Sequence, residues 1–248
     1  MSKVTVQYAQ VGTYRVRYEV VGEGEPVVLV HGLSGSTLWW RRNMAALARH
    51  HRVYLVDLPG FGAMRFQRSR FALEQVASWL LQWMEAVGLR KVHLIGHSMG
   101  GHICLWLAAY HPEIVSRLVL TAPAVIPRTN TVFGYFLPLL AGTRYTSPSF
   151  LGILLYDAWR AGPLTLFQAA RDLIAHDGRT VMQRVQAPTL LVWGEHDTLV
   201  PATLAPIIRE EIPDARLQIL EGAGHVCMFD RAHEFNRVVL AFLRGEEV

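Results

Sequence analysis

The stretch Val92-His-Leu-Ile-Gly-His-Ser-Met-Gly-Gly101 decides how this chain folds and where its chemistry lies. It begins with apolar residues typical of a buried strand, and apolar residues at helical spacing follow from Ile103 to Ala108. Ser98 therefore lies at a predicted turn from strand to helix, between two glycines that leave room for a tight turn. Such a turn exposes the serine hydroxyl, and the helix directs its free N–H groups toward it. This is the geometry that a nucleophile needs.

Apolar runs alternate with amphipathic segments along most of the chain. Besides the strand and helix around Ser98, we predict strands at 3–8, 14–21, 27–30, 53–56, 115–120, 188–193 and 217–220. We predict helices at 37–49, 73–87, 207–212 and 231–243. This alternation indicates an α/β fold with a mostly parallel, doubly wound sheet covered by helices on both faces, after an N-terminal hairpin.

Residues 122–185 break this alternation. They contain no clear strand but many aromatic residues, and prolines divide them into short helical pieces. We predict a helical cap (122–185) inserted into a core domain made of residues 1–121 and 186–248, lying over the carboxyl edge of the sheet. Such a cap would bury apolar substrate and exclude water. Candidate pocket residues are Trp39, Phe133, Phe136, Tyr156, Trp159 and Val226.

A serine nucleophile needs a base to take its proton and an acid to orient that base. The chain has 11 histidines, and His225 is favoured because it follows a predicted strand through the small residues Gly-Ala-Gly. His97 lies inside the serine turn, so we expect its side chain to point away from the site. Asp197 directly follows another apolar strand, whereas Asp57 precedes a Leu-Pro-Gly-Phe-Gly sequence typical of a structural turn. We therefore predict Ser98, Asp197 and His225 as the catalytic residues.

The order Ser, Asp, His is the one expected of the α/β-hydrolase fold. The chain resembles this family over nearly its full length, through motifs that occur in family order: His31-Gly32, Asp57-Leu-Pro-Gly-Phe-Gly62, Gly96-His-Ser-Met-Gly100, Gly194-Glu-His-Asp197 and Gly222-Ala-Gly-His225. The resemblance implies an oxyanion hole formed by the backbone N–H groups of Leu33 and Met99. Two such preorganised donors stabilise the negative charge of a tetrahedral intermediate.

A serine nucleophile indicates acyl transfer to water, whereas the similar haloalkane dehalogenases and epoxide hydrolases carry aspartate at this position. We predict a serine carboxylesterase for short- to medium-chain esters, with a small-molecule ester as substrate. Carbon–carbon bond (meta-cleavage product) hydrolase, lactonase, thioesterase, perhydrolase and pimeloyl-ester hydrolase activities need the same three residues and stay open. So does a slow-turnover ligand receptor in signalling, which would keep these residues but bind more than it turns over.

Composition excludes several other classes. The net charge of +4 is small and dispersed, so we expect no nucleic-acid partner, and we interpret the arginine-rich segment 65–70 as a solvated loop. No apolar run is long enough to span a membrane, and the N-terminus lacks a signal-peptide pattern, which leads us to expect a cytoplasmic protein. The 2 cysteines, Cys104 and Cys227, form no disulfide framework. We predict no cofactor and no metal site, and the sequence does not predict the oligomeric state.

Overall fold

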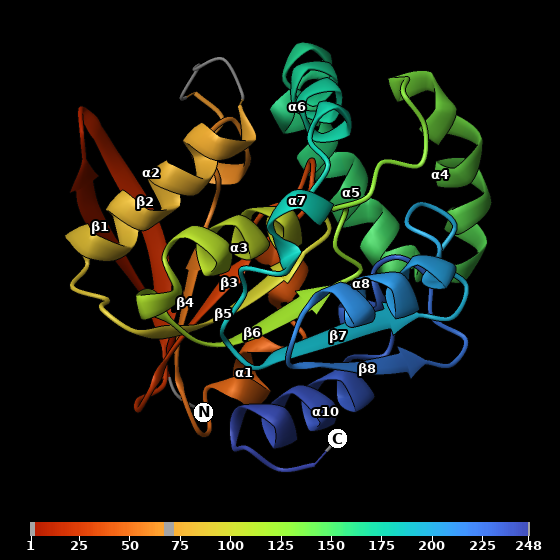
Figure 1. The fold of residues 1–248 in the computed structure, drawn as a ribbon. Helices are drawn as coiled ribbons and strands as arrows, with labels where there is room; N and C mark the ends of the chain where they lie inside the picture. Colours follow the sequence, from red (N-terminus) through yellow and green to blue (C-terminus); the bar gives the residue numbers. More distant parts are fainter. Residues whose placement is uncertain (1–2, 67–71, 248) are drawn as a thin grey trace.

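The computed structural model of the protein describes residues 3–66 and 72–247 (Figure 1). Residues 67–71 lie outside the described residues, and with them most of the arginine-rich segment that we interpret as a solvated loop.

The strands form one 8-stranded sheet in the order β1-β2-β4-β3-β5-β6-β7-β8. β1 and β2 form an antiparallel hairpin, β2 pairs antiparallel with β4, and the remaining neighbours are parallel. The prediction of a mostly parallel sheet is therefore confirmed. The strands are β1 (Thr5–Val11), β2 (Tyr14–Val21), β3 (Pro26–Val30), β4 (Arg52–Val56), β5 (Val92–His97), β6 (Val115–Thr121), β7 (Thr189–Gly194) and β8 (Ala215–Leu220).

Helices cover both faces of the sheet, as Figure 1 shows. The α-helices are α1 (Met44–Leu47), α2 (Leu73–Ala86), α3 (Met99–Tyr110), α4 (Phe136–Gly142), α5 (Pro148–Ala161), α6 (Pro163–Ala175), α7 (Arg179–Met182), α8 (Ala205–Glu211), α9 (Cys227–Asp230) and α10 (Ala232–Leu243). The 3₁₀ helices are η1 (Thr37–Trp40), η2 (Gly62–Met64), η3 (Pro112–Ile114), η4 (Val132–Tyr135), η5 (Thr143–Tyr145) and η6 (Ala202–Leu204).

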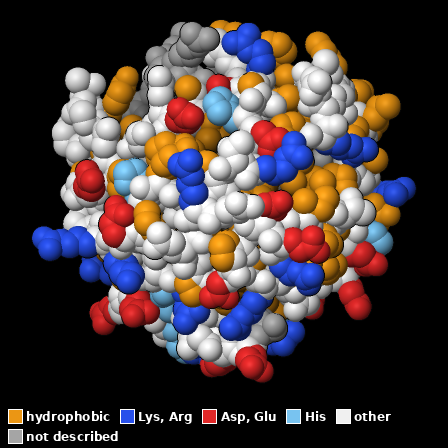
Figure 2. All heavy atoms as spheres, viewed as in Figure 1, with side chains coloured by type: hydrophobic (Ala, Val, Ile, Leu, Met, Phe, Trp, Pro, Cys, Tyr) orange, Lys and Arg blue, Asp and Glu red, His pale blue; other side chains and the backbone are white. Residues whose placement is uncertain are grey.

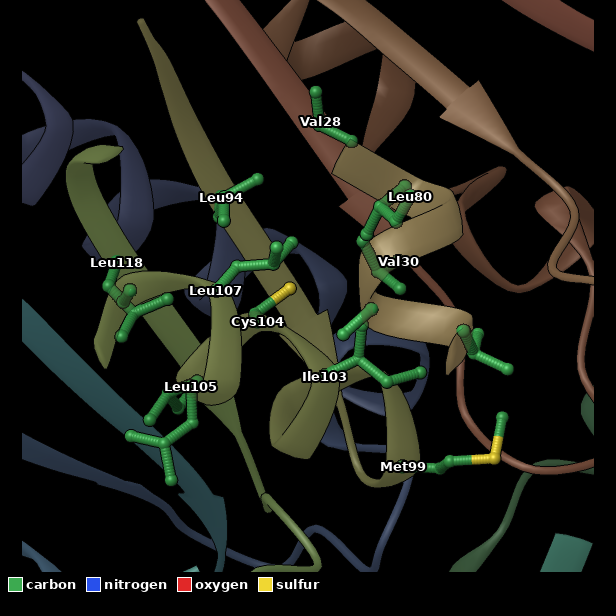
Figure 3. Close-up of a cluster of buried hydrophobic side chains, with 14 of the residues drawn as sticks. Val28, Val30, Leu80, Leu94, Met99, Ile103, Cys104, Leu105, Leu107 and Leu118 are labelled. Carbon is green, nitrogen blue, oxygen red and sulfur yellow. The ribbon is translucent and has the colours of Figure 1, made fainter. Parts of the chain in front are cut away.

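Alternate residues of the central strands belong to two separate cores. Val28 and Leu94 pack with α2 and α3 on one face, and Val27 and Ile95 pack with α1 and α10 on the other. This alternation follows from the two-residue period of a strand, and it explains why the central strands are apolar throughout. In Figure 3, the α3 side chains Cys104 and Leu107 lie near Leu94 of the sheet, and Ile103 lies near Val30.

The prediction of one continuous helix at 37–49 is wrong. The structure has the short 3₁₀ helix η1, a turn and then α1. Ser36 caps η1, because its hydroxyl accepts a hydrogen bond from Leu38 N at 3.3 Å. Asn43 lies in the turn, where its side-chain amide donates to Met228 O at 2.8 Å and to Asn236 Oδ1 at 2.9 Å. These long-range hydrogen bonds stabilise the break, and helical periodicity does not reveal them.

The segment between β6 and β7 contains helices and no strand in the described chain. Its last helix, α7, packs against α3 and α8, two of the helices that cover the sheet. The other helices carry many exposed apolar side chains, and Figure 2 shows orange patches over the region where Figure 1 places α4. No helix among the described residues is long and apolar enough to cross a membrane.

His102 joins α3 to the chain that follows β6. Its imidazole is 3% exposed, and Nδ1–H donates to the carbonyl oxygen of Ala124 at 3.0 Å. Burial lowers the pKa of His102 from its usual 6.5 to about 4. Below about pH 6.5 the unfolded chain thus binds a proton that the folded chain does not, and stability is lost as the pH falls from there toward 4.

We predict that His102→Asn, which keeps a donor for Ala124, reduces this acid sensitivity. Lowering the pH from about 7 to 5 should decrease the free energy of unfolding by about 2 kcal/mol less in the variant than in the wild type. Urea unfolding followed by circular dichroism at both pH values measures the difference. Equal decreases in the two proteins would show that His102 titrates normally in the folded state.

Candidate active site

Ser98 occupies the turn between β5 and α3 in a strained conformation, with φ 53° and ψ −115°. Such a backbone costs a non-glycine residue on the order of 1–3 kcal/mol, so the surroundings must hold it in place. Ser98 N donates to Thr121 O at 2.9 Å, and Ser98 O accepts from His102 N and Ala124 N, each at 3.1 Å. Within the described residues the hydroxyl of Ser98 has no hydrogen-bond partner, and the residue is 8% exposed. The backbone is therefore fixed while the hydroxyl stays available.

The two glycines of the turn allow α3 to approach the sheet closely. A Cβ on Gly100 would lie 2.5 Å from the carbonyl oxygens of both Val30 and His31. A Cβ on Gly96 would lie 2.4 Å from Gly100 O. Because backbone atoms cannot move aside as a side chain can, any larger residue at either place would displace α3 and the N–H groups at its start.

His225 and Asp197 form a hydrogen-bonded pair at the carboxyl edge of the sheet. His225 Nδ1 lies 2.7 Å from Asp197 Oδ2. The other oxygen of Asp197 accepts from Leu199 N and Val200 N, each at 2.9 Å. A carboxylate only accepts, so Nδ1 of His225 carries the proton and Nε2 is left as the acceptor that a general base needs. The Asp197 side chain is fully buried, whereas that of His225 is 13% exposed.

His97 links the serine turn to His225, contrary to our expectation that it points away. Its Nε2–H donates to His225 O at 3.0 Å, and the two rings lie 4.7 Å apart. On its other side the ring of Trp39 is 5.6 Å away. Burial holds the pKa of His97 well below its usual range, so it is neutral. The ring of His97, the residue directly before Ser98, therefore lies against His225, and the sequence does not reveal this direction.

Leu33 and Met99 carry the two backbone N–H groups that the resemblance implies for an oxyanion hole. In the described chain neither amide donates a hydrogen bond to another group. The loop that bears Leu33 is held by His31, whose Nδ1–H donates to Gly32 O at 2.8 Å. Its Nε2 accepts from Leu58 N at 3.0 Å, which requires a neutral imidazole, and burial correspondingly lowers the pKa of His31.

Asp157 of α5 fastens the helical segment to the same loop. Its Oδ2 accepts from Ser36 Oγ at 2.7 Å and from Trp39 Nε1 at 3.1 Å. Oδ1 lies 3.6 Å from Arg160 Nη1 and has no hydrogen-bond partner among the described residues. Burial raises the pKa of the Asp157 carboxyl. The carboxylate thus positions a loop that reaches the serine turn.

The sequence analysis missed Asp157, although a signal was present. The buried face of α5 consists of Phe150, Ile153, Asp157 and Ala161, which recur at helical spacing. An acid on an otherwise apolar face indicates a buried partner, but it does not identify that partner.

The candidate pocket residues fall into two groups. Trp39 is 3% and Val226 5% exposed, and both belong to the core cluster that contains α10. The candidate aromatics between residues 122 and 185 lie on the molecular surface, with exposures of 82% for Phe133, 65% for Phe136, 50% for Tyr156 and 80% for Trp159.

A recess of about 250 Å³ lies between η4 and α6 and includes Phe133. None of its lining residues is Ser98, Asp197 or His225.

Asp57 has the structural role that its turn sequence indicates. Its Oδ1 accepts from Thr37 N at 2.7 Å and its Oδ2 from Ala63 N at 2.6 Å, so it binds two loops. Cys104 and Cys227 are buried free thiols whose pKa values burial raises.

Comparison with known proteins agrees with this geometry. The family model described as "alpha/beta hydrolase fold" matches residues 25–169 and 143–232, which is most of the chain. The chain belongs to the alpha/beta hydrolase family. It is accordingly a hydrolase with the sheet order, strained serine turn and Asp–His pair described above.

Three relatives indicate the range of chemistry in the family. An acetyltransferase component of the acetoin cleaving system of Pseudomonas putida is 33% identical and aligns over 96% of this chain and 69% of its own. A pimeloyl-[acyl-carrier protein] methyl ester esterase of Aeromonas hydrophila is 30% identical over 92% of this chain and 99% of its own. A 2-hydroxy-6-oxononadienedioate/2-hydroxy-6-oxononatrienedioate hydrolase of Pseudomonas putida is 31% identical over 93% of this chain and 92% of its own.

The packing at Gly100 leads to a stability prediction. Gly100→Ala should lower the free energy of unfolding by at least about 2 kcal/mol, because the new methyl group meets two carbonyl oxygens. Gly152→Ala is the matched control, since Gly152 is also helical and a Cβ there meets nothing within 4 Å. The control should be more stable by about 0.5–1 kcal/mol. Chemical denaturation of both variants measures the difference, and similar values would contradict the predicted clash.

Asp157 leads to a second prediction. Asp157→Ala should destabilise the protein by about 2–4 kcal/mol, because it leaves Ser36 Oγ and Trp39 Nε1 buried without an acceptor. Asp157→Asn keeps an amide oxygen for both donors and should cost less than half as much. Thermal and urea unfolding distinguish the two variants. An equal loss would show that the charge of Asp157, and not its role as acceptor, stabilises the loop.

Proposed function

We propose that this hydrolase is a serine carboxylesterase that cleaves short- to medium-chain esters through an acyl-enzyme intermediate on Ser98. The observations that carry the proposal are the hydrogen bond between Asp197 and His225 and the strained turn that holds Ser98. The Aeromonas relative, an ester hydrolase by name, supports an ester as substrate.

In the proposed reaction, Ser98 Oγ attacks the ester carbonyl while His225 Nε2 takes the hydroxyl proton. The negative charge that develops on the carbonyl oxygen is stabilised by the N–H groups of Leu33 and Met99. Asp197 stabilises the imidazolium that forms at His225.

When the intermediate collapses, the bond to the alcohol breaks and His225 returns the proton to the leaving oxygen. A water molecule then attacks the acyl-Ser98 carbonyl with His225 again as base, which releases the acid and restores the serine. In this scheme the proton moves only between Ser98, His225, the alcohol and water.

We also propose that residues 122–185 act as the cap of this enzyme, over a core of 1–121 and 186–248. The contact from Asp157 to Ser36 and Trp39 supports this division, because it places α5 over the loop that bears Leu33. The exposed aromatics of the cap would then contact substrate only if the cap moves or the substrate is large.

Carbon–carbon bond hydrolysis is the second candidate, favoured by the Pseudomonas putida hydrolase. It would use the same three residues. The two functions are separated by substrate: an esterase cleaves simple alkyl esters rapidly, whereas a carbon–carbon hydrolase prefers a dienoate with a ketone at the scissile bond.

The proposal is tested with p-nitrophenyl esters from acetate to palmitate. We expect kcat/KM to be highest for short or medium chains and to fall by roughly 10³-fold or more in Ser98→Ala and in His225→Gln. His233→Gln is the control, because His233 is an exposed histidine of α10 outside the proposed catalytic residues, and its activity should match that of the wild type. Wild-type turnover no faster than that of Ser98→Ala would overturn the esterase proposal and favour the carbon–carbon substrates or a receptor.

A further inference from the structure

A second cluster of reactive side chains lies at the opposite edge of the sheet from Ser98. Glu25, His51 and His93 each place one potential ligand atom within 4.8 Å of the other two. They come from positions far apart in the sequence, directly before β3, directly before β4 and near the start of β5. These are the amino ends of three neighbouring parallel strands, whereas Ser98, Asp197 and His225 follow the carboxyl ends of β5, β7 and β8.

The register of the sheet brings the three residues onto one face. Pro26 pairs with Arg52, and Val27 pairs with His93. Extending the first pairing by one residue toward the amino ends places Glu25 beside His51. Side chains alternate along a strand, so Glu25, His51 and His93 share the face of Val27 and Ile95. That face is the one covered by α1 and α10. The backbone therefore places the three residues at the same edge of the sheet, from which their side chains meet.

The two imidazoles are buried and have unused nitrogens. His51 is 5% and His93 4% exposed. Among the described residues, both ring nitrogens of His51 and Nδ1 of His93 make no hydrogen bond of normal geometry, although the imidazole of His51 lies near the backbone of Glu25. A buried polar atom without a partner costs free energy unless something satisfies it. His93 Nε2 lies 3.1 Å from Glu25 Oε2, and the rings of His51 and His93 are 5.6 Å apart.

We propose that Glu25, His51 and His93 form a binding site for a divalent transition-metal cation, with Zn²⁺ the best match. Two imidazoles and one carboxylate are ligands that Zn²⁺ prefers, and tetrahedral Zn²⁺ separates neighbouring ligand atoms by about 3.4 Å. The distance of 3.1 Å between His93 Nε2 and Glu25 Oε2 is close to this value. Binding would therefore require mainly that the ring of His51 move closer to the other two residues.

The surroundings prepare the site for a cation. Glu25 supplies a negative charge, and its backbone is fixed because Arg52 N donates to Glu25 O at 3.0 Å. Arg117 lies near His93, and its positive charge would oppose a cation there.

The entry to the site is through Glu25, whose side chain is 76% exposed. A bound cation would join the turn before β3, the start of β4 and β5, and would therefore stabilise the fold. Its place at the amino edge of the sheet makes it independent of the proposed esterase chemistry.

The test compares wild type, Glu25→Gln and Glu23→Gln. Glu23 is an exposed acid of the same turn outside the cluster, and its variant is the matched control. Protein freed of metal by chelation is titrated with Zn²⁺ against a chromogenic chelator, and its melting temperature is measured with and without Zn²⁺. We expect wild type and Glu23→Gln to bind one equivalent more than Glu25→Gln, and only those two to gain several degrees in melting temperature.

A second variant, His93→Gln, removes a nitrogen ligand and should lose the same equivalent. Visible absorption of bound Co²⁺ in wild type, absent from both variants, would show nitrogen and carboxylate ligation directly. Equal Zn²⁺ stoichiometry and equal thermal shifts in wild type and Glu25→Gln would overturn the proposal, and would leave Glu25 and His93 as a hydrogen-bonded pair only. Because Glu25 is exposed, its variant folds even if His93→Gln does not.

Discussion

The close approach of α3 to β3 and β5 is the constraint on which the rest of the structure depends. Only glycine at 96 and 100 allows the helix backbone to lie against the carbonyl oxygens of Val30 and His31. This contact forces the chain to reverse sharply at Ser98, and it fixes the free amide of Met99 at the start of α3. A strained residue persists only where its neighbours leave no alternative, and here the two packed strands provide that restriction.

The carboxyl edge of the sheet is organised by buried polar side chains that bind backbone groups of loops. Asp57, Asp157 and Asp197 each accept hydrogen bonds from loop N–H groups or side-chain donors. His31 uses one ring nitrogen as donor and the other as acceptor. Loops cannot satisfy their own backbone as helices and strands do, so a site made of loops needs such partners to be rigid.

The two ends of the parallel strands carry different chemistry for a topological reason. At the carboxyl ends long loops leave the sheet, and they carry Asp197 and His225 toward Ser98. At the amino ends, His51 and His93 come from the two strands on either side of β3, and their rings lie 5.6 Å apart. A sheet of this kind can therefore hold two unrelated sites without steric conflict between them.

The sequence by itself determined the alternation of strands and helices, the turn at Ser98 and the positions of Asp197 and His225 after strands, because strand periodicity and small residues at strand ends are local signals. Tertiary structure alone decided the break after η1, the direction of His97, the role of Asp157 and the exposure of the cap aromatics. Each of these depends on a partner more than 50 residues away or on which side of a helix meets the core. The spacing of apolar residues predicts which helix or strand a residue belongs to. The hydrogen bond that its side chain makes depends on which distant loop the packed sheet places next to it.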